Sequence, residues 1–281
     1  MRTWTIGILS TVVIAVAIVA GLILIPTQAQ SPGYRAPRLP GTEHPDLNGL
    51  WQALNTANWD IQDHSAQAGP LVALGAWGAQ PAGMGVVEGG EIPYQEWALK
   101  KKQENFANRL RVDPDDFALG DPELKCYLPG VPRATYMSFP FQIIQSQNAL
   151  LISYEYADAS RIVHMSNPIK PPLDSWMGWS NGRWDGDTLV IDVTGLNDST
   201  WFDRAGNFHS DALHVVERYT LVTSDRLHYE ATIEDPKVFT RPWKISMPLY
   251  RHAEPNAQRL EFKCVEFTEE LIYGSLKKKT N

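Results

Sequence analysis

The chain lacks the short motifs that mark nucleotide, haem and calcium sites. Its 281 residues contain no G-x-G-x-x-G turn, no P-loop, no C-x-x-C-H and no EF-hand loop. They also contain no G-x-S-x-G nucleophile elbow and no internal repeat. These absences argue against a nucleotide enzyme, a covalently bound haem and an α/β-hydrolase. The sequence indicates no particular cofactor.

Basic residues are in the minority. Lys and Arg number 25 against 32 Asp and Glu, which gives a net charge of −7. An acidic surface repels nucleic acid, so we expect no nucleic-acid partner. The Lys277-Lys278-Lys279 run within the basic tail 277–281 is a local exception, and a solvated terminus explains it most simply.

Cysteine is equally scarce, with only Cys126 and Cys264 in the chain. In an oxidising compartment an even pair predicts one disulfide, and the spacing fits no metal or redox motif. Chain-entropy arguments value the closure of so long a loop at about 4–5 kcal/mol. Two buried free thiols are the alternative.

The most informative segment that is present is the uncharged run from Ile6 to Ile25. Twenty residues at about 1.5 Å each span about 30 Å, the thickness of the hydrocarbon in a bilayer. Arg2 supplies a positive flank, and Thr27 and Ala29 are small residues where a signal peptidase cuts. Residues 1–29 are therefore expected to be a cleaved signal peptide or an uncleaved N-terminal transmembrane anchor. Either form places the rest of the chain on the periplasmic side of the inner membrane.

The remainder reads as one domain behind a linker. Residues 30–45 are rich in proline and glycine and are expected to form the linker. Residues 46–276 are expected to form a single β-rich domain. An irregular excursion over 52–140 interrupts this domain and contains one external helix, predicted from Tyr94 to Leu110.

From residue 139 onward, apolar residues alternate with polar ones at the period of a strand. The segment from Asp46 to Trp51 predicts a first strand, and Asp185-Gly186-Asp187 predicts a tight hairpin turn. The later predicted strands are 141–146, 149–156, 161–166, 178–184, 188–194, 213–222, 226–234, 243–251 and 259–267. This pattern predicts a mainly β fold, either an antiparallel barrel or a strongly bent β-sandwich.

One predicted strand carries a carboxylate on its apolar face. Alternation places five residues on that face: Leu213, Val215, Glu217, Tyr219 and Leu221. A buried carboxylate costs several kcal/mol unless it is paired. One interpretation of Glu217 is a salt bridge to an inward arginine such as Arg133 or Arg241. The other is an acid, a base or a ligand in a pocket.

A polar loop over residues 201–214 leads into this strand and contains His209, Asp211 and His214. Together with Glu217, these side chains are the candidate catalytic groups of a hydrolase or an isomerase/lyase, with or without a metal. The H-x4-H spacing into a strand does not bring both imidazoles to one face, so we predict no metal site. The alternative is that these residues bond to the backbone of the loop.

Aromatic and cationic side chains occur together in several segments. The candidate ligand-binding residues are Arg133, Tyr136, Trp176, Trp179, Arg183, Trp184, Trp201 and Tyr219. Such side chains line pockets for flat apolar ligands, and an arginine stacks on the ligand or binds its acid group. Core packing with a surface cation–π pair is the alternative.

Residues 182–192, Gly-Arg-Trp-Asp-Gly-Asp-Thr-Leu-Val-Ile-Asp, resemble the signature G-R-W-(D/E)-G-D-T-L-V-(V/I)-D of a large family of exported bacterial proteins. The likeness extends to residues 126–133, 209–218 and 233–236 and covers roughly residues 45 to 275. It implies export and a β-rich body, and no reaction. Gly49-Leu50-Trp51 also resembles the first-strand G-x-W of lipocalin-like β-barrels, a pattern from which the 52–140 excursion departs.

These patterns favour an exported, non-catalytic β-barrel protein, anchored in the membrane or released. It would bind an apolar or aromatic small molecule or act as an accessory subunit of a membrane-protein complex. The membrane itself is an expected partner if residues 6–25 are retained. The alternative is a periplasmic enzyme built on Glu217 and the nearby histidines. Convergence of those side chains in one concave pocket would support this alternative.

Overall fold

A computed structural model describes residues 33–69, 71, 74–75, 79–111, 113, 115–116, 118–266 and 268–276. Residues 35–276, as far as they are described, belong to one compact unit. The predicted membrane run Ile6–Ile25 and the basic tail 277–281 lie outside the described residues. Among the residues that are described, no helix is long and apolar enough to span a bilayer.

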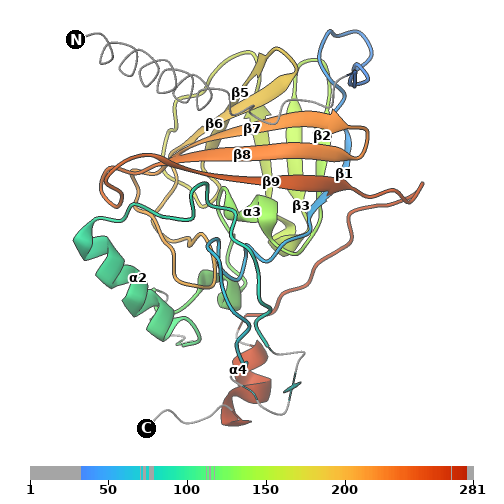
Figure 1. Ribbon diagram of the computed structural model, residues 1–281. Helices are drawn as coiled ribbons and strands as arrows, with labels where there is room; N and C mark the ends of the chain where they lie inside the picture. The colour runs from blue at the N-terminus through green and yellow to red at the C-terminus, as the bar shows by residue number, and fades with distance from the viewer. Residues whose placement is uncertain are drawn as a thin grey trace, which may run out of the picture. The chain divides into compact units, whose positions relative to one another are not determined.

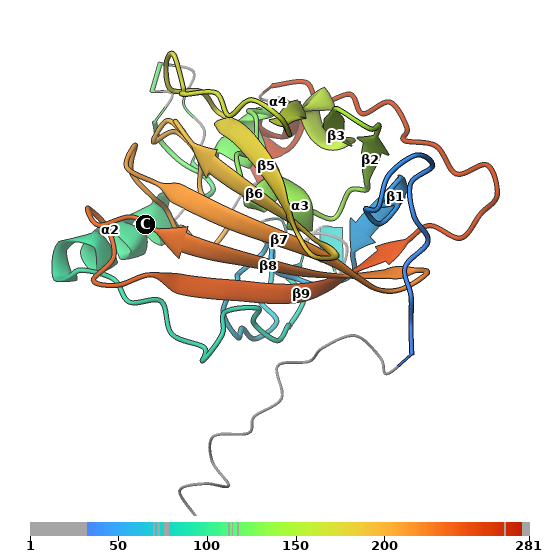
Figure 2. The ribbon, with the colours of Figure 1, turned by 90° about the horizontal axis from the view of Figure 1, so that it is seen from above.

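Nine strands close into a barrel (Figures 1 and 2). Neighbours in the chain are neighbours in the sheet, and the last strand pairs with the first. The strands are β1 (Gly49–Ala53), β2 (Phe141–Gln145), β3 (Leu150–Tyr154), β4 (Ser160–His164), β5 (Trp179–Asp185), β6 (Thr188–Thr194), β7 (His214–Thr223), β8 (Arg226–Glu234) and β9 (Trp243–Arg251). Every pair is antiparallel except β4 with β5, which is parallel. The predicted mainly β fold is confirmed, as a closed barrel and not an open sandwich.

The barrel forms because its strands alternate between apolar and polar residues. In β8, four apolar side chains are buried: Leu227, Tyr229, Ala231 and Ile233. The side chains between them lie toward solvent. Each large apolar side chain buried in this way contributes about 1.5–3 kcal/mol. Where the alternation is regular, the predicted strands agree with the observed ones to within two residues.

The predicted strand 259–267 is wrong. Its described residues, 259–266, form no strand, since β9 already bonds to β1 and the barrel offers no free edge. Side chains hold it instead: Arg259 lies 2.7 Å from Asp158, and the Phe262 ring packs on Phe139. Cys264 forms the predicted disulfide with Cys126, with the two Cα atoms 5.6 Å apart.

One external helix, α2 (Glu96–Asn108), lies where a helix was predicted (Figure 1). The other helical elements are short and were not predicted: α3 (Arg133–Tyr136), α4 (Thr268–Tyr273) and the 3-10 turns η2 (Pro122–Lys125), η3 (Tyr156–Asp158) and η4 (Gly274–Leu276). All four residues of α3 are buried, and in the view from above α3 lies within the ring of strands (Figure 2).

The two ends of the barrel are built differently. At one end, here named the hairpin end, β2–β3, β5–β6 and β7–β8 turn back through short loops. The predicted turn after Asp185 is one of these, with Gly186 at φ +56°, where a residue without Cβ is favoured. At the other end, here named the loop end, lie the long connections 54–140 and 195–213 and the short helix α3.

The segment expected to be a linker, as far as it is described, lies against the barrel at the hairpin end. Ala36 and Leu39 are buried, and both terminal nitrogens of Arg38 donate to Asp187 in the β5–β6 turn. Residues 36–45, here named the strap, therefore form part of the surface of this end.

Candidate functional site

The barrel interior contains a buried ion pair. Arg161 of β4 lies 2.5 Å from Glu217 of β7, and a second bond of 3.0 Å makes the pair bidentate. Burial opposes the charge on Arg161, but the adjacent carboxylate outweighs it and raises the pKa of the guanidinium. The predicted salt bridge of Glu217 is thus present with a different partner. Neither Arg133 nor Arg241 takes part, because Arg133 binds other carboxylates and Arg241 is exposed.

Tyrosines complete the polar contacts of this pair. Tyr219 and Tyr229 each donate a hydrogen bond of 2.9 Å to Glu217, and Arg161 donates one of 3.0 Å to the hydroxyl of Tyr154. Burial raises the pKa of all three phenols, so they remain donors at neutral pH. Thr135 of α3 lies 3.4 Å from the Tyr219 hydroxyl and links the short helix to the same network. The interior around Glu217 is therefore filled by bonded side chains.

A second buried ionic network lies at the loop end. Arg133 donates to Asp121 at 2.8 Å and to Glu123 at 2.7 Å, and Arg204 donates to Glu123 at 2.6 Å. Burial opposes ionisation of Glu123, but Arg204 and Arg133 lower its pKa to about 2. Asn58 bridges Arg133 and Glu123. This network ties the two long connections of the loop end together.

Asp203 organises the loop that was expected to carry chemistry. Its carboxylate accepts bonds from the backbone N–H groups of Ile61, Ala205 and Asn207 and from the Asn207 amide. Burial and the neighbouring Asp60 carboxylate raise the pKa of Asp203 to about 7. Because its oxygens are occupied by the loop itself, we assign Asp203 a structural role.

The structure does not bring the four candidate catalytic residues together. Glu217 faces the interior, whereas His214, on the same strand, is half-exposed outside and lies 3.1 Å from Asp192. His209 is buried, and its ring bonds to Thr200 at 2.6 Å and to the Ser210 carbonyl at 2.9 Å. Burial lowers the pKa of this imidazole, so it stays neutral.

Asp211, the fourth of these residues, is exposed and lies 2.5 Å from Lys237. Among the residues that the structure describes, no group of three or more His, Cys, Asp or Glu side chains is arranged to hold a metal ion. Within the described part of the chain, the four candidate residues thus occupy separate environments.

The candidate ligand-binding residues divide among four places. Three of them are buried and hydrogen-bonded within the protein: Arg133, Tyr136 and Tyr219. The hydroxyl of Tyr136 donates to the Phe202 carbonyl. Trp179 and Arg183 lie on the outward side of β5, where Arg183 also borders the hairpin-end pocket. The other three line cavities: Trp176 and Trp201 at the loop end, and Trp184 at the hairpin end.

The loop-end cavity has a volume of about 450 Å³. Its aromatic wall consists of Tyr127, Trp176 and Trp201, and the Tyr127 and Trp176 rings meet edge to face at 5.4 Å. Lys125 is buried in the same wall, with Nζ 5.3 Å from the Tyr127 ring centroid and 3.0 Å from the Leu119 carbonyl. Burial lowers the pKa of this amine. Asp198 and Ser199 lie at the exposed rim.

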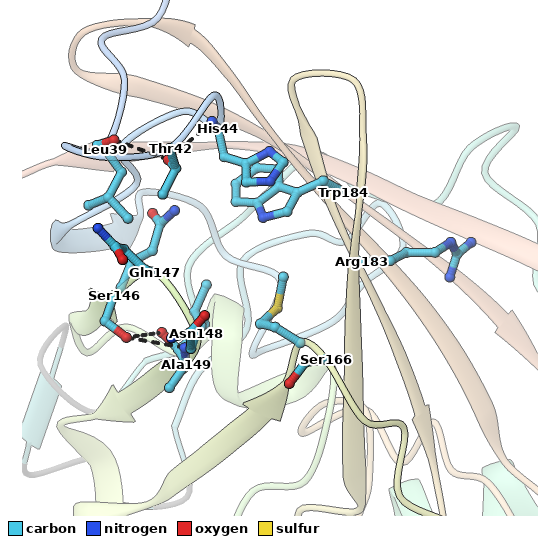
Figure 3. Close-up of a pocket in the computed structure, with 13 residues that line it drawn as sticks. Leu39, Thr42, His44, Ser146, Gln147, Asn148, Ala149, Ser166, Arg183 and Trp184 are labelled. Atoms are coloured by element: carbon cyan, nitrogen blue, oxygen red, sulfur yellow. Dashed lines mark hydrogen bonds between the residues drawn. The ribbon is translucent and has the colours of Figure 1, made fainter.

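The hairpin-end pocket has a volume of about 290 Å³ and lies between the strap, the β2–β3 turn and β5 (Figure 3). The imidazole of His44 stacks on the indole of Trp184, with centroids 4.7 Å apart and planes 5° from parallel. Polar side chains of the turn, among them Gln147 and Asn148, form the opposite wall. Arg183 points away from this space (Figure 3).

Most residues of these cavities were missed in the sequence, among them His44, Lys125 and Tyr127. His44 lies in a segment that was expected to be a linker. Lys125 and Tyr127 flank Cys126, so the predicted disulfide was the signal that a fixed, structured loop lies there.

No family model, no curated protein and no solved structure matches this chain. The resemblance to exported bacterial proteins therefore stays a prediction.

Proposed function

We propose that this protein is an exported, non-catalytic binding protein whose loop-end cavity takes a flat aromatic molecule. The observation that carries the proposal is the convergence of Tyr127, Trp176 and Trp201 on one cavity of about 450 Å³. Ligand pockets of small molecules span about 300–1,000 Å³ and are mostly apolar, with a few polar groups for orientation. Lys125 is the cationic group of this wall, so an acid group on the ligand suits it.

The arrangement of the cavity supports a preformed site. Edge-to-face ring contacts favour fixed orientations, here between Tyr127 and Trp176. The disulfide between Cys126 and Cys264 holds the segment that contains Lys125 and Tyr127 against the C-terminal segment. A ligand entering such a wall loses little free energy to ordering of the protein.

The enzyme alternative has less support. General acid–base chemistry needs groups within about 2.6–3.2 Å of the proton that moves. The carboxylate of Glu217 is enclosed by Arg161 and two tyrosine hydroxyls, and His209 is buried between Thr200 and Ser210. Neither residue lines the loop-end cavity.

The form in which the protein is exported is part of the proposal: a lipocalin-like barrel on the periplasmic side, anchored or released. Large apolar side chains exposed near the C-terminus, Leu271, Ile272 and Leu276, favour a further contact with a membrane-protein complex. Intact mass after gentle extraction from native membranes separates the forms. A chain that begins at Gln30 and purifies alone is a released protein, and a chain that retains residues 1–29 with companions is an anchored subunit.

The binding site is tested by isothermal titration of the full chain with 2-naphthoate and its neutral counterpart 2-naphthamide. We expect naphthoate to bind and Trp176→Ala to weaken it about fivefold to tenfold, the loss of one aromatic contact of about 1–1.5 kcal/mol. Lys125→Met is expected to abolish the preference for the acid over the amide.

Trp184→Ala is the matched control, because it removes the same side chain from the opposite end of the barrel. Each variant is first shown to be folded by circular dichroism. The proposal is refuted if no aromatic probe binds the native chain, or if both tryptophan variants weaken naphthoate equally.

A further inference from the structure

The hairpin-end pocket differs chemically from the aromatic cavity. Its ionisable lining side chains are His44 and Arg183, and Arg183 points away from it (Figure 3). The rest of the lining is apolar or carries neutral amides and hydroxyls: Leu39, Thr42, Gln145, Ser146, Gln147, Asn148, Ala149, Leu150, Met165, Ser166 and Trp184. A charged ligand would lose its hydration there without a partner of opposite charge.

Some of the polar groups in the lining are engaged within the protein, and others are available. Gln145 accepts from the Leu47 N–H and donates to the Pro45 carbonyl, so both ends of its amide are used. Gln147 donates one long bond of 3.4 Å to the Pro40 carbonyl. Within the described part of the chain, the side chains of Asn148 and Ser166 make no hydrogen bond. These groups offer donors and acceptors to a ligand with several hydroxyls.

The apolar part of the lining gives such a ligand a second kind of contact. The stacked His44 and Trp184 rings form a rigid aromatic wall, and Leu39, Leu150 and Met165 add aliphatic surface. A sugar ring has C–H faces that pack on an indole, while its hydroxyls point outward to amides. The volume of 290 Å³ equals about ten water molecules, which suits a ligand of one sugar ring or a similarly compact polyol.

The wall made by the strap is fixed to the barrel. Arg38 binds Asp187 of the β5–β6 turn through two bonds, and the strap carries Leu39, Thr42 and His44 into the lining. Thr42 accepts from the His44 N–H and donates to the Leu39 carbonyl, which sets the turn that presents the imidazole. The pocket is therefore preformed, as a weak, specific site for a small ligand requires.

We propose that the hairpin-end pocket is a second binding site, specific for a neutral polyhydroxylated ligand such as a single sugar residue, held between Trp184 and the amides of the β2–β3 turn. This site is separate from the loop-end cavity, since no residue lines both. Its existence does not depend on the aromatic ligand.

The test titrates the full chain with methyl β-glucoside, methyl N-acetyl-β-glucosaminide and, as a charged counterpart, glucuronate, by saturation-transfer NMR and calorimetry. At least one neutral glycoside is expected to saturate the native chain at millimolar concentration and to exceed glucuronate. Trp184→Ala should weaken it about fivefold to tenfold, and Asn148→Ala about fivefold, the equivalent of one aromatic contact and one hydrogen bond.

Trp176→Ala is the control and is expected to leave glycoside binding unchanged. Naphthoate binding is measured on the same samples, so a failure of the aromatic site is distinguished from a failure of this one. The proposal is overturned if no neutral glycoside saturates the chain up to tens of millimolar. It is also overturned if glucuronate binds more tightly than the neutral glycosides. Equal losses from Trp184→Ala and Trp176→Ala overturn it as well.

Discussion

The two ends of the barrel use charge in opposite ways. At the loop end, and in the barrel interior behind it, arginines and carboxylates form buried networks with bidentate contacts. At the hairpin end, the pair that fastens the strap, Arg38 with Asp187, is partly exposed, with 42% and 35% of the side chains accessible. Burial decides how strongly each pair is coupled to the fold, because an exposed pair exchanges its contacts for water at little cost.

This difference follows from the lengths of the connections. Hairpins of a few residues satisfy their own backbone groups and need no further support. In the long connections 54–140 and 195–213, Asp203 accepts bonds from backbone N–H groups, and Arg133 and Glu123 tie side chains of the loops together. A cavity between such supported loops keeps its shape, as a binding site must.

The largest effect is expected from Arg161→Met, which leaves Glu217 buried without a cation. Breaking a buried pair in this way costs about 3–5 kcal/mol. The double variant Arg161→Met/Glu217→Gln removes both charges. The oxygen of the amide introduced at position 217 still accepts hydrogen bonds from the hydroxyls of Tyr219 and Tyr229. The double variant should recover most of the lost stability, because replacement of a buried pair by neutral groups is often tolerated.

Urea denaturation at constant m-value measures these changes. A loss below about 1 kcal/mol for Arg161→Met would place the pair in the class of surface salt bridges. It would also break the contrast between the interior and the hairpin end.

Acid should act on the loop end through Glu123. Its folded pKa of about 2 lies below the unfolded value of about 4.5, so the folded state binds protons less readily. Its contribution, about 3 kcal/mol, is therefore complete above pH ~4.5 and is lost as the pH falls toward about 2. Glu123→Gln should be less stable than the native chain at pH 6, and the difference should shrink below pH ~4.5.

Denaturation curves between pH 2.5 and pH 6 measure this difference. Asp203 provides the internal check, because its pKa is shifted in the direction opposite to that of Glu123. Ionisation of Asp203 therefore lowers the free energy of unfolding as the pH rises from about 4 to about 7. A gap between the native chain and Glu123→Gln that stays constant down to pH ~3 would contradict the assignment to Glu123.

Local pattern explains which parts of this architecture the sequence predicts. Alternation is a property of each strand, so β6, β8 and β9 are predicted to the residue, and Glu217 is predicted to face inward. The partner of Glu217 depends on which strand lies across the barrel. Arg161 shares the inward face of β4 with Val163, but nothing local says that this face meets β7.

The candidate sites were predicted less well, because they are made by connections between strands. Trp176 and Trp201 are separated in sequence and converge only through the loops around β5 and β6. The four residues of α3 are too few for a helical period to show. The strap was missed for a different reason: its proline and glycine content describes a chain without regular structure, and such a chain still packs when Leu39 and Arg38 find partners.

The smallest effect is expected from Arg38→Ala at the hairpin end. An exposed pair contributes little to stability, and salt screens it further, with a Debye length of about 10 Å at 0.1 M. The free energy of unfolding should therefore fall only slightly, and by still less at high salt, while glycoside affinity falls because the strap loses its fastening to Asp187. A loss as large as that of Arg161→Met would mean that the strap belongs to the core, and the two ends would then differ in their loops but not in how charge holds them.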